Sequence, residues 1–152
     1  MSYVRFSSAK FVGCFGCLLM LISTGAMKAG AAETKLEIQL VWGTNDEASP
    51  DSTHKPLEAA MVKKLGMFKW KKYFLVNRQT IPVSSAEQKV RLSEQCVVEM
   101  KNLGDSRYEI NVFGKGKHVL KKTGKITSAA PFVIAGDDKN DCAWFILIRE
   151  IQ

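Results

Sequence analysis

The stretch that decides the fold is residues 131–149, PFVIAGDDKNDCAWFILIR. Two apolar runs, 132–135 and 143–148, flank a polar turn that is rich in aspartate. Apolar runs separated by such a turn predict a β-hairpin. The second run is apolar at every position, so both faces of its strand need cover. We therefore predict that 143–148 forms a central strand that is packed on both sides.

Working outward from this hairpin, turn residues separate further strand-like segments. Residues 35–42 alternate apolar and polar side chains, which predicts a half-buried strand with Glu37 and Gln39 on its polar face. In 56–66 the apolar residues have helical spacing, which predicts one short helix after the first strand. More strands are predicted over 69–81, 90–92, 96–100, 108–113 and 118–126. The fold class is mainly β (α+β), an antiparallel β-sandwich or barrel-like domain.

The first 31 residues have the features of an export signal peptide. Arg5 and Lys10 precede an uncharged, mostly apolar stretch, and the small residues 29–31 match a signal-peptidase site. We predict cleavage after Ala31, with Ala26 as the alternative. Residues 32–152 then form a single exported domain, periplasmic or extracellular, with no membrane span. A retained anchor is the competing interpretation, because the apolar stretch approaches the roughly 20 residues that cross a bilayer.

The charge of the chain bears on its possible partners, and its cysteines bear on a possible disulfide. The chain has a net charge of +7, and residues 1–31 hold three basic residues and no acidic ones, so the exported domain keeps +4. That charge permits anionic partners without requiring them. Cys96 and Cys142 are the cysteines outside the signal. In an oxidising compartment two cysteines on strands usually pair, which predicts a Cys96–Cys142 disulfide.

The most suggestive functional feature is a lysine-rich strand. Its lysines fall at odd positions, which places them on one face of a strand: Lys115, Lys117, Lys121 and Lys125. Trp70 and Tyr73 lie in a second lysine-rich segment and are candidate aromatic anchors. A positive stripe with aromatic residues is suited to a polyanion. The alternative is that the lysines protect an exposed edge strand from aggregation.

The remaining chemistry is sparse. The sequence contains no catalytic motif, no metal-binding motif and no specific nucleic-acid motif, so we predict no catalytic residue, metal or cofactor. The predicted function is a non-catalytic exported binding or assembly module of the cell envelope, whose partner is an anionic envelope polymer or another exported protein. One alternative is a protein-interaction subunit or enzyme inhibitor that acts through an apolar patch near Trp42. A small hydrolase is a further alternative and requires a concave pocket with convergent polar groups.

Overall fold

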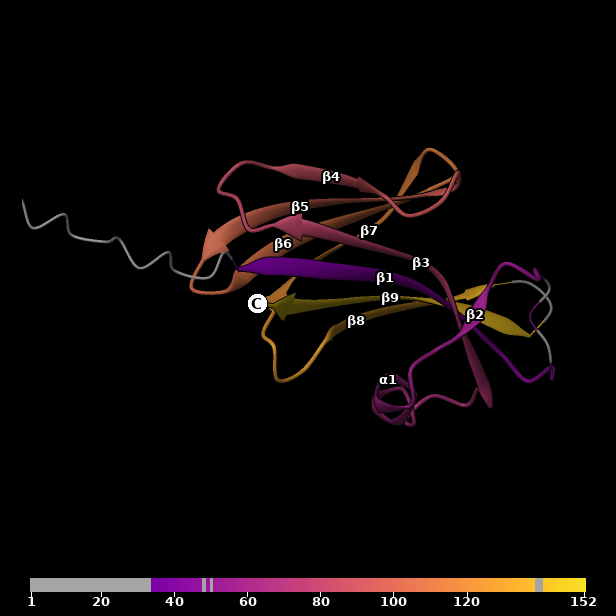
Figure 1. The fold of residues 1–152 in the computed structure, drawn as a ribbon. Coiled ribbons are helices and arrows are strands. Elements are labelled where there is room, and N and C mark those ends of the chain that lie inside the picture. The colour runs from indigo at the N-terminus through magenta and orange to yellow at the C-terminus, as the bar shows by residue number, and fades with distance from the viewer. Residues whose placement is uncertain (1–33, 48, 50, 139–140) are drawn as a thin grey trace, which may run out of the picture.

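The computed structural model describes residues 34–47, 49, 51–138 and 141–152. The predicted signal peptide lies outside these residues, as do positions 139 and 140 of the hairpin turn. The described chain runs through nine strands and one helix (Figure 1). These are β1 (Lys35–Thr44), β2 (Lys55–Pro56), α1 (Ala59–Lys64), β3 (Lys72–Pro82), β4 (Gln88–Arg91), β5 (Cys96–Gly104), β6 (Arg107–Gly114), β7 (Lys117–Lys125), β8 (Phe132–Asp138) and β9 (Cys142–Ile151).

The strands form two antiparallel sheets. The five-stranded sheet has the order β2-β3-β1-β9-β8, and the four-stranded sheet has the order β4-β5-β6-β7. The predicted mainly β architecture with one short helix is therefore confirmed. No helix within the described ranges is long and apolar enough to cross a membrane.

The C-terminal hairpin forms as predicted. β8 and β9 pair antiparallel, and β9 lies between β8 and β1 in the five-stranded sheet. Ile146 and Ile148 of β9 are buried in the core between the two sheets, whereas Phe145 and Leu147 are buried on the other face of the same sheet. A strand covered on both faces must be apolar throughout, which explains the uninterrupted apolar run.

Two hydrophobic clusters therefore flank the five-stranded sheet. The first core joins it to the four-stranded sheet, through residues such as Ile38, Val98 and Ile110. The second core lies on the opposite side, where Leu57, Met61 and the segment that follows α1 cover the sheet. Figure 1 shows α1 on the side of β1 and β9 away from β4–β7. The molecule thus has three layers.

The helix is shorter than the predicted 56–66. Pro56 belongs to the short strand β2, and the Leu57 N–H donates to the Tyr73 carbonyl at 2.9 Å. Because residues 56 and 57 pair with β3 in this way, α1 begins only at Ala59. The predicted apolar face is confirmed, since Met61 and Leu65 are buried in the second core.

The expectation of a half-buried first strand is wrong. Glu37 and Gln39 are only 6% and 1% exposed. The Glu37 carboxylate accepts hydrogen bonds from Arg149 Nε and from Gln39 Nε2, each at 2.7 Å. An opposite charge and a hydrogen-bond donor offset the cost of burying the carboxylate, so a polar face can lie inside the protein.

The predicted disulfide between Cys96 and Cys142 is not formed. Both described side chains are thiols, and they begin strands of different sheets. Cys96 packs at the margin of the first core, whereas Cys142 Sγ lies 3.7 Å from Thr44 Oγ1 at the end of β1. The sequence pattern placed both residues on strands correctly but carried no information on which sheet each strand joins.

Candidate functional site: the basic face of the four-stranded sheet

Two tight turns fix the register of the four-stranded sheet. The turn between β5 and β6 has positive φ at Asp105 (52°) and Ser106 (58°), and the turn between β6 and β7 has positive φ at Lys115 (52°) and Gly116 (75°). Positive φ at both central residues is the geometry of the type I′ hairpin, whose twist matches that of the flanking strands. β5, β6 and β7 therefore form a tight meander.

One face of this meander packs on the first core, so the alternate residues point outward. Val98, Ile110 and Val112 face the core. Among the described residues, the outward positions carry six cations and two carboxylates. The six cations, which we call the basic face, are Lys89 and Arg91 of β4, Lys101 of β5, Arg107 of β6, and Lys121 and Lys125 of β7. The carboxylates are Glu99 and Glu109.

The two carboxylates neutralise two of the six cations. Lys89 Nζ lies 2.9 Å from Glu99, and Lys121 Nζ lies 2.8 Å from Glu109. The hydrogen bond from Lys121 holds the pKa of Glu109 below its ordinary value of 4.5. The other four cations enter no ion pair with any residue that the structure describes: Arg91, Lys101, Arg107 and Lys125.

Two of these cations lie directly opposite each other. Arg107 on β6 is paired in register with Lys125 on β7. Like charges at directly opposite positions destabilise a sheet, by roughly 0.2–1 kcal/mol for a cross-strand pair. The sheet therefore retains a local repulsion that an anionic partner would relieve.

The prediction that Lys115, Lys117, Lys121 and Lys125 share one face of a strand is wrong. The β6–β7 pairing has a bulge at Val112/Phe113, with Val119 as the extra residue of β7. A bulge of one residue reverses which face the following side chains occupy. Lys121 and Lys125 share the outer face, but Lys117 pairs with Gly114 on the opposite face and Lys115 occupies the turn.

The edge-strand interpretation of the lysines has structural support. β7 is an edge strand of the four-stranded sheet, and lysines on such a strand discourage pairing with another chain. Edge protection does not explain Lys101 and Arg107, however, because β5 and β6 are the interior strands. These residues, together with Arg91, were missed by the sequence analysis, because single basic residues on three separate strands produce no local run.

Trp70 and Tyr73 are not part of the basic face. They are 8% and 5% exposed and belong to the second core, on the far side of the five-stranded sheet. The Tyr73 hydroxyl donates to the Leu65 carbonyl at 3.1 Å, and burial raises the pKa of the tyrosine. Trp70 is covered in part by Lys69, whose Nζ lies 4.5 Å from the ring centroid. Neither ring presents an open stacking platform.

Trp42 is half-buried in the wall of a pocket between the two sheets. Cys96 lines the same pocket, and burial raises the pKa of its thiol. A raised pKa disfavours the thiolate that a nucleophilic cysteine requires. The raised pKa therefore argues against Cys96 as a nucleophile.

Within the described residues, no group of three or more His, Cys, Asp or Glu side chains is arranged to hold a metal ion. The outward side of the four-stranded sheet carries six cations and two carboxylates among the described residues. No family model, curated protein or solved structure matches the chain.

Proposed function

We propose that this protein is an exported, non-catalytic module of the cell envelope, built as a two-sheet β-sandwich, that binds an anionic polymer or surface through the basic face. The observation that carries the proposal is the charge of that face, where six cations are opposed by only two carboxylates. A cluster of one sign attracts and concentrates oppositely charged partners. The proposed binding surface therefore spans the four-stranded sheet and not the single strand β7.

The spacing of the cations suits a repetitive polyanion. Neighbouring strands lie about 4.8 Å apart, and side chains on one face recur about every 6.6 Å along a strand. Lys and Arg on adjacent strands therefore form a shallow grid of positive charge. A polymer or surface with closely spaced phosphate or sulfate groups can contact several of these cations at once, without a pocket for any one group.

The first test is charge reversal at two separated points of the basic face, Arg91→Glu with Lys125→Glu. We expect this double variant to bind immobilised dextran sulfate at least about 30-fold more weakly, since each cation near an anionic surface contributes about 1 kcal/mol. The fold should tolerate the change, because a glutamate at 125 faces Arg107 and replaces repulsion with attraction. Elution salt and equilibrium binding are the measurements.

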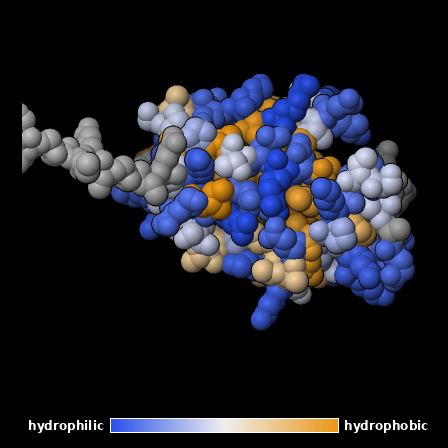
Figure 2. Space-filling view, in the orientation of Figure 1, coloured by the Kyte–Doolittle hydropathy of each residue, from blue (hydrophilic) through white to orange (hydrophobic). Residues whose placement is uncertain are grey.

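The matched control is Lys55→Glu with Lys63→Glu. Both lysines are exposed, lie on β2 and α1, and enter no ion pair with described residues. Such a control is needed because hydrophilic residues also cover much of the side of the molecule seen in Figure 2. Equal losses in the two double variants would show that net charge alone governs retention, and would contradict the proposal.

A second test uses pH. As the pH falls below about 4.5, Glu109 becomes protonated, but its depressed pKa delays this step to a lower pH than for an ordinary glutamate. Lys121 and Lys101 then lose their counter-charge, so binding to a sulfated polymer, which stays ionised, should strengthen. The same protonation removes the stability that the ionised carboxylate contributes at higher pH, so circular dichroism must confirm that the protein is still folded.

The variant Glu109→Gln isolates this effect. It should bind the sulfated polymer more tightly than the wild type at pH 7, and it should gain less when the pH is lowered well below about 4. If the wild type binds the polymer more tightly than Glu109→Gln at pH 7, Glu109 does not oppose the ligand. The basic face would then not be the contact surface.

A further inference from the structure

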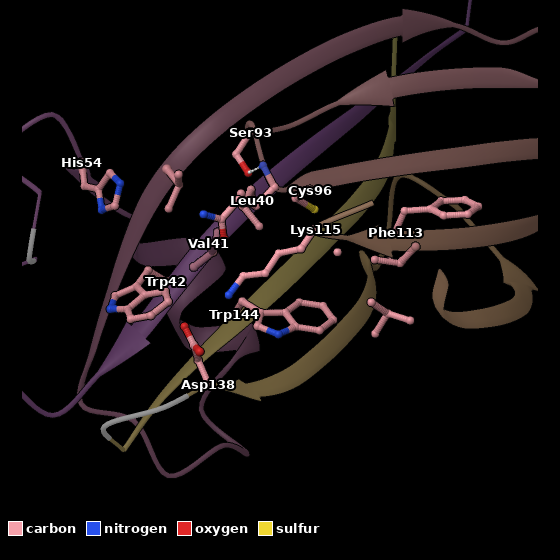
Figure 3. Close-up of a pocket in the computed structure, with 15 residues that line it drawn as sticks. Leu40, Val41, Trp42, His54, Ser93, Cys96, Phe113, Lys115, Asp138 and Trp144 are labelled. Carbon is pink, nitrogen blue, oxygen red and sulfur yellow. Dashed lines mark hydrogen bonds between the residues drawn. The ribbon is translucent and has the colours of Figure 1, made fainter. Parts of the chain in front are cut away.

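A pocket of about 310 Å³ opens between the two sheets, at the end where β1 finishes and the turn between β6 and β7 lies (Figure 3). The five-stranded sheet contributes Leu40, Trp42 and Trp144, and the four-stranded sheet contributes Val112, Phe113 and Val119. Its volume is within the usual range of small-molecule sites, about 300–1,000 Å³. None of the six cations of the basic face lines it.

The walls of the pocket are mostly apolar. Val112 is fully buried on the core side of β6, and the bulge in β7 brings Val119 to the rim, where it is 49% exposed. Two indole rings from neighbouring strands, β1 and β9, add large apolar surfaces, since Trp42 and Trp144 lie opposite each other in the register. Burying apolar surface here would favour a ligand by about 25 cal/mol for each Å².

The rim of the pocket carries a lysine in a fixed position. Lys115 is held at φ 52° by the tight turn, and Figure 3 shows its side chain extending into the pocket toward Trp144. None of the ion pairs formed by the described residues includes Lys115. Its aliphatic stem can cover apolar surface while the ammonium group stays at the opening. Asp138 is the carboxylate that also lines the pocket.

We infer that this pocket binds a single-chain amphiphile with an anionic head group, of which a fatty acid is the simplest case. The alkyl chain lies among the apolar walls between the sheets, and the carboxylate lies at the rim beside the Lys115 ammonium group. This second site is independent of the polyanion proposal, since it uses neither the six cations of the basic face nor their register.

The lining offers both apolar surface and a charged rim. A small polar solute would leave the indole and valine surfaces without apolar contact, and a pure hydrocarbon would make no polar contact with Lys115. An anionic amphiphile satisfies both parts. Because Asp138 repels an anionic head group at the same rim, the affinity should rise when its charge is removed.

The test titrates the full chain with octanoate, decanoate and dodecanoate below their micelle-forming concentrations, and with decanol as the neutral counterpart. Intrinsic tryptophan fluorescence, to which Trp42 and Trp144 in the pocket contribute, and calorimetry report binding. We expect the affinity to rise about fourfold with each added methylene until the pocket is full, since one buried methylene contributes about 0.8 kcal/mol. Decanoate should bind at least about tenfold more tightly than decanol.

Three variants separate the parts of the inference. Val119→Trp fills the rim at an exposed position and should abolish decanoate binding. Lys115→Asn, which suits a left-handed backbone, should weaken decanoate about tenfold and leave decanol unchanged. Asp138→Asn should tighten decanoate binding. Lys117→Asn is the control, because Lys117 is exposed at the other end of the same turn and does not line the pocket.

Equal affinities for decanoate and decanol would overturn the assignment of an anionic head group. Undiminished decanoate binding by a folded Val119→Trp variant would overturn the site itself. The double variant of Arg91 and Lys125 should bind decanoate like the wild type, so failure of the polyanion proposal and failure of this inference give different results.

Discussion

Replacing Phe145 with alanine is expected to lower the free energy of unfolding by about 3–5 kcal/mol, the range for removing a fully buried aromatic side chain. Phe145 is 0% exposed and lies at the centre of the second core. Its ring packs edge-on against Phe68 at 4.9 Å and against Tyr73 at 5.5 Å between centroids. Urea denaturation followed by circular dichroism gives the change directly.

The size of this effect follows from what the ring joins. Phe145 belongs to β9 and Tyr73 to β3, whereas Phe68 lies in the segment between α1 and β3. The ring also lies against Gly43 of β1, where an added Cβ would be 2.7 Å from Phe145 Cε2. Without the ring, three parts of the chain lose a shared contact, and a rigid sheet beneath them cannot collapse into the cavity.

Leu103→Ala is the matched control, since Leu103 is 48% exposed and its replacement should change the unfolding free energy by less than about 0.5 kcal/mol. A loss at Phe145 no larger than the loss at Leu103 would mean that the helical segment does not depend on this ring. Phe145→Leu should fall between the two, because it retains part of the buried volume.

The strands could be predicted from the sequence because their signals are local. Apolar runs and turn residues identified the hairpin of β8 and β9, and glycine with polar neighbours marked the turns on either side of β6. A two-residue turn also fixes the register of the strands that it joins, so the meander of β5, β6 and β7 follows from short-range chemistry.

The functional face could not be predicted in the same way, because it is assembled from separate strands. A stripe on one strand assumes unbroken alternation, and the bulge opposite Val112/Phe113 breaks it. The sequence contains no turn residue that would predict the bulge. Arg91, Lys101 and Arg107 join the basic face only through strand pairing. The disulfide prediction was wrong for the same reason, since it required knowing which sheet holds Cys96 and which holds Cys142.

The burial of Glu37 also could not be predicted from local sequence. Replacing this residue is expected to have the second large effect on stability. We expect Glu37→Leu to lower the free energy of unfolding by about 3 kcal/mol, at the low end of the range for breaking a buried ion pair. Arg149 Nε lies 2.7 Å and Arg78 Nε 3.5 Å from the Glu37 carboxylate. The two arginine side chains are 30% and 36% exposed and keep access to water, which limits the loss.

Gln39 adds to the cost of removing Glu37. Its Nε2 donates to Glu37, and its Oε1 has no hydrogen-bond partner among the described residues. With leucine at position 37, this fully buried amide would lose that bond as well, and a buried polar group without a partner costs roughly 1–3 kcal/mol. Glu37→Gln keeps an oxygen that can accept from Gln39, so its loss should be smaller, about 1–2 kcal/mol.

Thermal and urea unfolding of the two variants distinguish a specific polar network from simple occupancy of space. A network requires Glu37→Leu to be clearly less stable than Glu37→Gln, because only the glutamine preserves an acceptor. If Glu37→Leu equals or exceeds the wild type in stability, the carboxylate and its arginines do not stabilise the first strand.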